Sequence, residues 1–150
     1  MRHPLGAKWT FTPSPNNNHT FLSYSVEPTC LKPPDVRGTL APSTKKAYLF
    51  AKFDGYFLQN DRFPWSIDIF GEIQNRLGIE FISGFQDGSK ELTHRFSEVG
   101  IVNYGKMVKD RFFEKLRETF VVIGMGLPVI SPTPWDGLCM GIPVSSSSWT

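Results

Sequence analysis

Short apolar runs recur along this chain and alternate with stretches of helical spacing. Three of them, residues 47–53, 79–85 and 120–123, have the length and the β-branched or aromatic side chains of buried strands. Residues 20–27 alternate partly between apolar and polar side chains and are predicted to form a further strand, which Pro28 closes. The pattern therefore predicts strands spread over most of the sequence.

Two stretches between these strands have the spacing of amphipathic helices. Between residues 64 and 77 the apolar side chains fall three or four positions apart, and Gly78 follows where such a helix would end. A second helical pattern starts near Met107 and places Val108, Phe112 and Leu116 on one side. Residues 86–95 are polar, include a glycine and are predicted to form a loop. Strands separated by helices favour an α/β fold with a Rossmann-like parallel sheet, which binds ligands where its strands end.

The length of the chain and its composition predict one folded domain behind an extended arm. Residues 1–18 are rich in proline and asparagine and read as an arm or linker, and residues 19–150 form the domain. The net charge is +2, and 16 basic and 14 acidic residues are interspersed, so the chain lacks the basic stripe that nucleic-acid binding needs. No apolar run approaches the ~18 residues that span a bilayer, so we expect no signal peptide or membrane segment in this chain.

The residues after the last predicted strand could bind a phosphate. Gly124 and Gly126 would let the backbone approach a ligand closely, and Pro132 suits the first turn of a following helix, whose N-terminus favours anions. Asp136 would lie about one turn into that helix, within reach of ribose hydroxyls. The alternative is a plain strand-loop-helix corner with a favourable acid near the helix start. Lys52 is likewise either an edge charge that reaches solvent or a phosphate partner.

The sequence lacks the residue patterns of metal sites and of serine hydrolases. The histidines have no partners at metal-ligand spacing, no serine-hydrolase elbow occurs, and no Asp-x-Asp pair is available to hold a metal against a sugar nucleotide. Cys30 and Cys139 form no C-x-x-C motif, so their spacing indicates neither a zinc site nor a disulfide framework. Asn18 begins a weak N-glycosylation sequon, which matters only in a lumenal protein. We therefore expect no metal and no cofactor.

Several blocks in order resemble one enzyme family. They are the runs HTFLSYSVE at residues 19–27, KFD at 52–54, LRET at 116–119, VIGMGLP at 122–128, SPTPWD at 131–136 and CMGIP at 139–143. Together they are similar to the α-1,6-mannosylglycoprotein 6-β-N-acetylglucosaminyltransferases, the N-acetylglucosaminyltransferase V family, over about residues 13–143. That resemblance implies a metal-independent, inverting transferase of the two-domain GT-B architecture, anchored in the Golgi membrane with its catalytic part in the lumen. Such enzymes act in protein N-linked glycosylation.

The resemblance also implies roles for individual residues. The matched part is similar to the C-terminal half, which binds the donor UDP-GlcNAc, so this chain would be a fragment of a UDP-GlcNAc-dependent hexosyltransferase that acts on the 6-hydroxyl of a mannose. Lys52 would contact the diphosphate, the backbone of Ser131, Pro132 and Thr133 would cradle it, and Asp136 would meet the donor. The general base lies in the other half of the family's fold. No catalytic residue is therefore assigned here, and the chain alone is expected to bind the donor without turnover.

Two departures from the family pattern keep other interpretations open. Ile130 stands where animal relatives have a second acid. Residues 145–148 are serines where the family continues through another strand, so we expect an incomplete C-terminal end and an exposed sheet edge at residues 120–123. A non-catalytic nucleotide-sugar-binding module, or a degenerate paralogue, is the main alternative. A nicotinamide-dependent oxidoreductase is disfavoured, because the one G-x-G lies at residue 124 and is followed by Leu-Pro.

Overall fold

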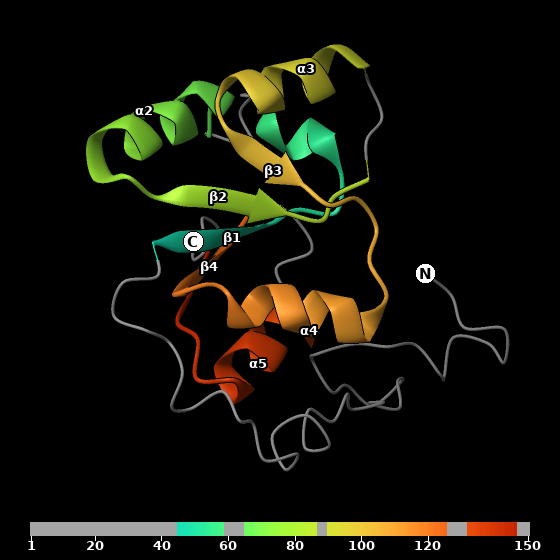
Figure 1. Cartoon of the computed structure of the whole chain (residues 1–150). Coiled ribbons are helices and arrows are strands. Elements are labelled where there is room, and N and C mark those ends of the chain that lie inside the picture. The colour runs from blue at the N-terminus through green and yellow to red at the C-terminus, as the bar shows by residue number, and fades with distance from the viewer. Residues whose placement is uncertain (1–44, 59–64, 87–89, 126–131, 147–150) are drawn as a thin grey trace, which may run out of the picture.

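The computed structural model describes residues 45–58, 65–86, 90–125 and 132–146. Within these ranges strands and helices alternate along the chain (Figure 1). The elements are β1 (Lys46–Phe50), the 3-10 helix η2 (Asp54–Phe57), α2 (Ile67–Leu77), β2 (Glu80–Ser83), α3 (Lys90–Glu98), β3 (Ile101–Asn103), α4 (Lys109–Arg117), β4 (Val121–Gly124), α5 (Pro132–Cys139) and β5 (Val144–Ser146). The predicted strand at residues 20–27 and the predicted arm at residues 1–18 lie outside the described residues.

The five strands form one sheet in the order β3-β2-β1-β4-β5. Every neighbouring pair in this order is parallel. A parallel sheet requires crossover connections, and the intervening helices provide them. The predicted α/β fold with a Rossmann-like parallel sheet is thus the observed one.

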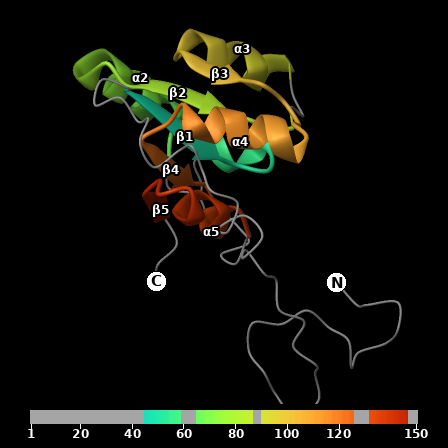
Figure 2. The same ribbon diagram turned by 60° about the horizontal axis from the view of Figure 1, so that its bottom comes forward.

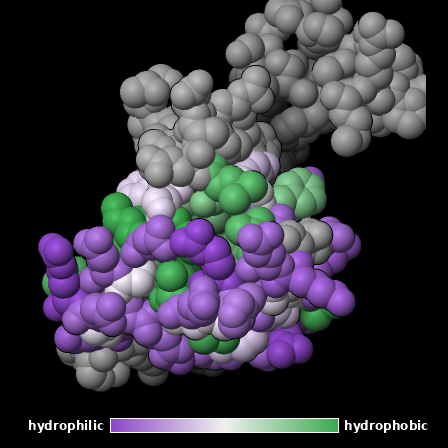
Figure 3. Space-filling model, turned by 90° about the horizontal axis from the view of Figure 1, so that it is seen from above, coloured by the Kyte–Doolittle hydropathy of each residue, from purple (hydrophilic) through white to green (hydrophobic). Residues whose placement is uncertain are grey.

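Helices cover both faces of the sheet, as Figures 1 and 2 show: α2 and α3 lie on one face, and α4 and α5 on the other. Successive side chains of a strand point to opposite faces. On β1, Leu49 therefore joins the core beneath α2 and α3, whereas Tyr48 joins the core beneath α4. Seen from the side of α2 and α3, the described surface is mostly hydrophilic (Figure 3). The helices therefore turn their polar sides to solvent, as amphipathic helices do.

The core beneath α2 and α3 is built around four phenylalanines. The ring of Phe57 lies 5.9 Å from that of Phe70, 5.2 Å from that of Phe85 and 4.9 Å from that of Phe96, measured between centroids. All four side chains are buried. Because Phe57 belongs to η2, this cluster fixes the segment that follows β1.

Helix α2 lies within the predicted range and ends where the sequence predicts, with a cap at each end. The Ser66 hydroxyl caps its start by accepting a hydrogen bond from the Asp68 amide at 3.3 Å. Gly78 follows the last residue with φ of 65°, a left-handed conformation that glycine adopts without strain. Its amide donates to the carbonyl of Gln74 at 2.8 Å. The predicted stop at Gly78 is confirmed.

The loop predicted for residues 86–95 is wrong from residue 90 onward, because α3 begins there. The helix is polar along most of its length and buries Phe96, while Leu92 and Val99 pack partly against the same core. These three apolar residues have helical spacing, but the surrounding charges obscured it. The strand β3 also went unpredicted, since three residues are too short a run for a period to be recognised.

The C-terminal serines do not replace a strand, contrary to the expectation from sequence. Val144–Ser146 forms β5, which pairs with β4 so that Val144 lies opposite Val122. Strand β4 consequently lies inside the sheet, and the exposed edge predicted at residues 120–123 is wrong. Buried Ile142 and half-buried Val144 hold this segment on the core. Serine at an exposed position such as Ser145 is compatible with strand pairing, which uses the backbone.

Candidate functional site

The order of the strands places a topological switch point between β1 and β4. From β1 the chain proceeds to β2 and β3 on one side, and it then returns to the other side of β1 to form β4 and β5. In open parallel sheets ligands bind at the carboxyl ends of the strands on either side of such a point. The candidate site is therefore the carboxyl edge where β1 and β4 end.

Lys52 lies at this edge, two residues beyond the end of β1. The strand was predicted to extend to residue 53 but ends at Phe50, so Lys52 belongs to the segment that leaves the sheet. Its backbone carbonyl accepts a hydrogen bond from the Gln86 amide at 3.2 Å, which ties it to the end of β2. Its side chain is exposed, and the ammonium lies 5.4 Å from the centroid of the Phe53 ring. The residue is thus held by its backbone while its charge faces solvent.

The neighbouring rim of β2 and β3 is fixed by side-chain hydrogen bonds to the backbone. The buried Ser83 hydroxyl donates to the Leu49 carbonyl at 2.6 Å. The amide group of Asn103 donates to the Phe85 carbonyl at 3.2 Å and accepts from the Gly105 amide at 3.1 Å. These bonds hold the carboxyl edge in one backbone arrangement without occupying the side chain of Lys52.

Near the same edge, the backbone at Gly84 packs closely against Tyr48 and Gly105. A Cβ atom there would lie 2.6 Å from the Tyr48 hydroxyl oxygen and 3.1 Å from the Gly105 carbonyl oxygen. The glycine therefore lets the segments after β2 and β3 pack against Tyr48. Burial raises the pKa of the Tyr48 phenol, which stays neutral at physiological pH.

On the other side of the switch point, Gly124 ends β4 opposite Phe50 of β1. The amide of Met125 continues the ladder by donating to the Phe50 carbonyl at 2.8 Å. Lys52 and the segment after β4 thus leave the sheet at the same edge. The predicted site residues Gly126 and Ser131 and the departure at Ile130 lie outside the described residues, as does Asn18.

The helix predicted after β4 is present and begins at Pro132, as expected for proline in a first helical turn. Its N-terminus follows the carboxyl end of β4. Pro132 and Pro134 have no N–H, so Thr133 and Trp135 supply the donors among the first four residues. Thr133 is half-buried and Trp135 is exposed.

Asp136 occupies the predicted position one turn into α5, but its side chain is buried, with 5% of the residue exposed. It lies on the side of the helix that faces the sheet, next to Gly137. A Cβ atom on Gly137 would contact the side chains of Val144 and Val122, at 3.4 and 3.6 Å. The helix therefore lies close against β4 and β5. A contact between Asp136 and a ribose remains a prediction.

Cys139, the last residue of α5, is disulfide-bonded. Its spacing in the sequence did not indicate a disulfide. Covalent pairing depends on which residues meet in space, and two isolated cysteines carry no spacing signal of the kind that small disulfide-rich domains show. The other cysteine of the chain, Cys30, lies outside the described residues.

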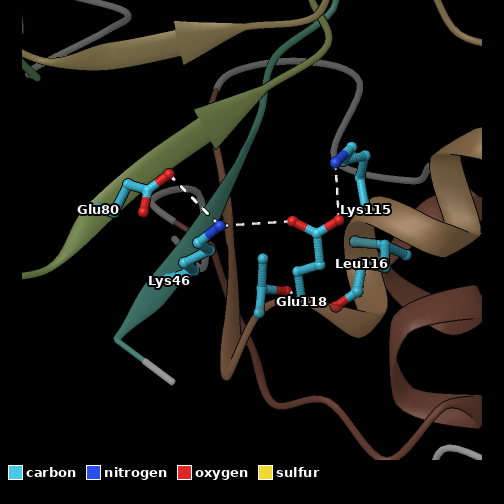
Figure 4. A network of polar contacts seen from close by, with 6 residues as sticks. Lys46, Glu80, Lys115, Leu116 and Glu118 are labelled. Atoms are coloured by element: carbon cyan, nitrogen blue, oxygen red, sulfur yellow. Dashed lines mark hydrogen bonds and ion pairs between the residues drawn. The ribbon is translucent and has the colours of Figure 1, made fainter. Parts of the chain in front are cut away.

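Within the part of the chain that the structure describes, the most extensive charge network lies at the opposite, amino edge of the sheet (Figure 4). The Lys46 ammonium lies 3.5 Å from a carboxylate oxygen of Glu80 and 3.5 Å from one of Glu118. The Lys115 ammonium donates to the other oxygen of Glu118 at 2.7 Å. This hydrogen bond lowers the pKa of Glu118 and raises that of Lys115. The network joins the starts of β1 and β2 to the end of α4, which is a structural role.

Sequence reasoning missed two residues of the candidate site, Phe53 and Gln86. They form an isolated parallel bridge just beyond the ends of β1 and β2. Phe53 is 44% exposed, although it directly follows an apolar run. The available signal for Phe53 was its place beside Lys52, but the hydrophobic pattern assigned Phe53 to the end of a buried strand.

Two structural features and two comparisons with known proteins bear on the candidate function. In the part of the chain that the structure describes, no group of three or more His, Cys, Asp or Glu side chains could hold a metal ion. Over the same ranges, no helix is long and apolar enough to cross a membrane. No protein-family model matches the sequence, and no curated protein matches it.

Proposed function

We propose that this chain is the donor-binding part of an inverting, metal-independent glycosyltransferase of GT-B architecture, which transfers N-acetylglucosamine from UDP-GlcNAc to the 6-hydroxyl of a mannose in N-glycans. The observation that carries the proposal is the switch point between β1 and β4. There an exposed lysine and the start of a helix follow two adjacent parallel strands at one edge of the sheet. Both features favour a diphosphate. The ordered sequence blocks supply the choice of donor.

The proposed chemistry divides between this chain and a second domain. A carboxylate of that domain would remove the proton from the mannose hydroxyl, and the resulting oxygen nucleophile would attack the anomeric carbon as the bond to UDP breaks. Charge then develops on the diphosphate. Lys52 and the N–H groups of Thr133 and Trp135 would stabilise it, which a preorganised site does without moving at the moment of reaction. In this scheme the chain alone binds the donor.

The disulfide of Cys139 supports the proposed lumenal location. Disulfides persist in oxidising compartments such as the secretory route and are rare in the cytosol. A Golgi enzyme with its catalytic part in the lumen meets that condition.

The proposal is tested by titrating the isotopically labelled protein with UDP and recording amide NMR shifts. We expect residues around Lys52 and at the start of α5 to shift, and the shifts to weaken strongly in Lys52→Ala. The matched control is Lys45→Ala. Lys45 directly precedes β1 at the opposite edge and donates to the Leu77 carbonyl at 3.2 Å, so the control removes the same charge from the other end of the same strand. Well-dispersed spectra whose amide shifts do not change on addition of UDP would contradict the proposed donor site.

The alternative, a binding module without catalysis, rests on Ile130 in place of an acid. Both functions predict UDP binding, so an activity assay separates them. Release of UDP in the presence of the second domain and a mannose-terminated acceptor excludes the alternative. Binding of UDP with no turnover in that mixture favours it.

A further inference from the structure

Helix α5 presents an apolar face to solvent beside its disulfide. Trp135 and Leu138 are 55% and 50% exposed, although both are large and hydrophobic. Residues 135 and 139 are one helical turn apart and residue 138 lies beside them, so all three side chains share one side of the helix. Asp136, Gly137 and Met140 are buried on the other side, against the sheet. The described part of the chain leaves this outer face uncovered.

The disulfide indicates which segment of the chain is the candidate to cover this face. Cys139 is disulfide-bonded, and the sequence contains one other cysteine, Cys30. Bonded cysteines have Cα atoms about 4.4–6.8 Å apart. A disulfide between the two within one chain would therefore require Cys30 to lie beside the end of α5.

Residues 20–27, which precede Cys30, have an alternation of apolar and polar side chains that suits packing against this face. If residues 20–27 are extended, as their alternation predicts, then Leu22, Tyr24 and Val26 point to one side. The four residues from Val26 to Cys30 span at most about 14 Å, because an extended chain covers about 3.3–3.6 Å per residue. The helix rises only about 6 Å between Trp135 and Cys139. An extended segment of that length is therefore long enough for its apolar side to reach both exposed side chains.

We infer that the Trp135 and Leu138 face of α5 is the docking surface for this chain's own residues 19–31, which a disulfide between Cys30 and Cys139 clamps in place. The docked segment covers the outer side of the helix whose inner side packs on β4 and β5. The inference does not depend on what the carboxyl edge binds.

The covalent part is tested by peptide mapping. Protein made in an oxidising compartment is alkylated before denaturation and digested with trypsin without reduction. Trypsin does not cut between Lys32 and Pro33, so Cys30 falls in the peptide of residues 9–37, and Cys139 in that of residues 118–150. We expect one disulfide-linked species of these two peptides, which separates on reduction. Two copies of either peptide linked together, or both cysteines alkylated, would overturn the inference.

The packing part is tested by hydrogen exchange of residues 20–27, read by mass spectrometry. We expect slow exchange in the oxidised protein, and exchange about tenfold faster or more in Leu138→Ser, because the substitution weakens docking. Leu77→Ser is the matched control, since Leu77 is 57% exposed on α2 and should leave the segment protected. Unchanged exchange in β1 and β2 shows that each variant is folded. Fast exchange of the segment in the unsubstituted protein, or equal effects of both variants, contradicts docking.

Discussion

The two edges of the parallel sheet are built from different interactions. At the amino edge, Lys46 bridges Glu80 and Glu118, and Lys115 pairs with the same Glu118 carboxylate. At the carboxyl edge, buried phenylalanines and backbone hydrogen bonds fix the chain, and the charge of Lys52 faces a ring and solvent instead of a carboxylate among the described residues. Paired charges thus neutralise one another at the amino edge. The edge with an unneutralised charge on a fixed backbone is the one that suits an anionic ligand.

The largest effect is expected where the carboxyl edge depends on apolar packing. Phe57→Ala removes the ring that contacts Phe70, Phe85 and Phe96 and anchors η2. Removing a buried aromatic ring costs ~3–5 kcal/mol of unfolding free energy. Urea denaturation followed by circular dichroism measures the loss. A loss below about 1 kcal/mol would mean that this edge does not rest on the aromatic cluster.

Gly84→Ala tests the close approach at the same edge. The added methyl group would meet Tyr48 and the Gly105 carbonyl, and overpacking of this kind costs ~1–3 kcal/mol. Thermal unfolding should show the loss. Gly55→Ala is the control, because a Cβ atom at Gly55 meets nothing within 4 Å. Equal melting temperatures for the two variants would show that the residues around Gly84 shift to accept the methyl group at little cost.

A third prediction concerns Gly137, which lies between the two edges in α5. Its φ is not positive, and a methyl group would contact Val144 and Val122 without overlap. Gly137→Ala should therefore raise the unfolding free energy by ~0.5–1 kcal/mol, because alanine favours helix and restricts the unfolded chain. Thermal melting of the variant measures the gain. A decrease would mean that α5 lies closer to β5 than described.

Glu118→Gln tests the amino edge and should cost less than ~1 kcal/mol, since the pairs are partly exposed. The folded-state pKa of Glu118 is lowered by Lys115, so the contribution is present above the ordinary value of 4.5 and is lost as the pH falls through the lowered pKa. The pKa of Lys115 is raised, so the contribution also fades as the pH rises beyond its ordinary 10.5. Urea unfolding at pH 3 and pH 7 measures the loss on the acid side, and unfolding at pH 11 measures the loss on the alkaline side. A difference from the unsubstituted protein that grows at pH 3 contradicts this account.

The smallest effect on stability is expected for Lys52→Ala, within about ±0.5 kcal/mol, because the exposed ammonium contacts a single ring. Urea unfolding at neutral pH measures it. A large loss of unfolding free energy would mean that Lys52 stabilises the fold and is not a free ligand contact. Lys109→Ala provides a comparison, since the Lys109 ammonium lies at a similar 5.2 Å from the ring of Phe113.

The sequence predicted those elements whose signals are local. The spacing before Gly78 and the proline at residue 132 marked one helix end and one helix start, because caps and fixed φ values act within a single turn. The parallel sheet followed from the alternation of strands and helices. Helix α3 and strand β5 were missed, because charges hid the few core contacts of α3 and serines hid the pairing of β5.

The candidate site was predictable only in outline. Lys52 was singled out for its charge beside an apolar run, and the sheet does place it at the carboxyl edge. Its position outside the strand, the burial of Asp136 and the role of Gln86 depend on how segments distant in sequence meet. The disulfide of Cys139 depends on the same kind of contact. Such contacts leave no periodic trace in a single sequence.

The glycine within α5 has a consequence for the order of folding. Eight residues that include two prolines and a glycine make a weak helix on their own, since nucleation is unfavourable and glycine costs about 1 kcal/mol relative to alanine. The helix therefore gains its stability from Val122 and Val144, on strands that must already be paired. We expect α5 to form late, after the sheet has closed on its β5 side. The proposed diphosphate site would then be complete only after β5 has paired with β4, so binding there by a nascent chain would have to wait for that pairing.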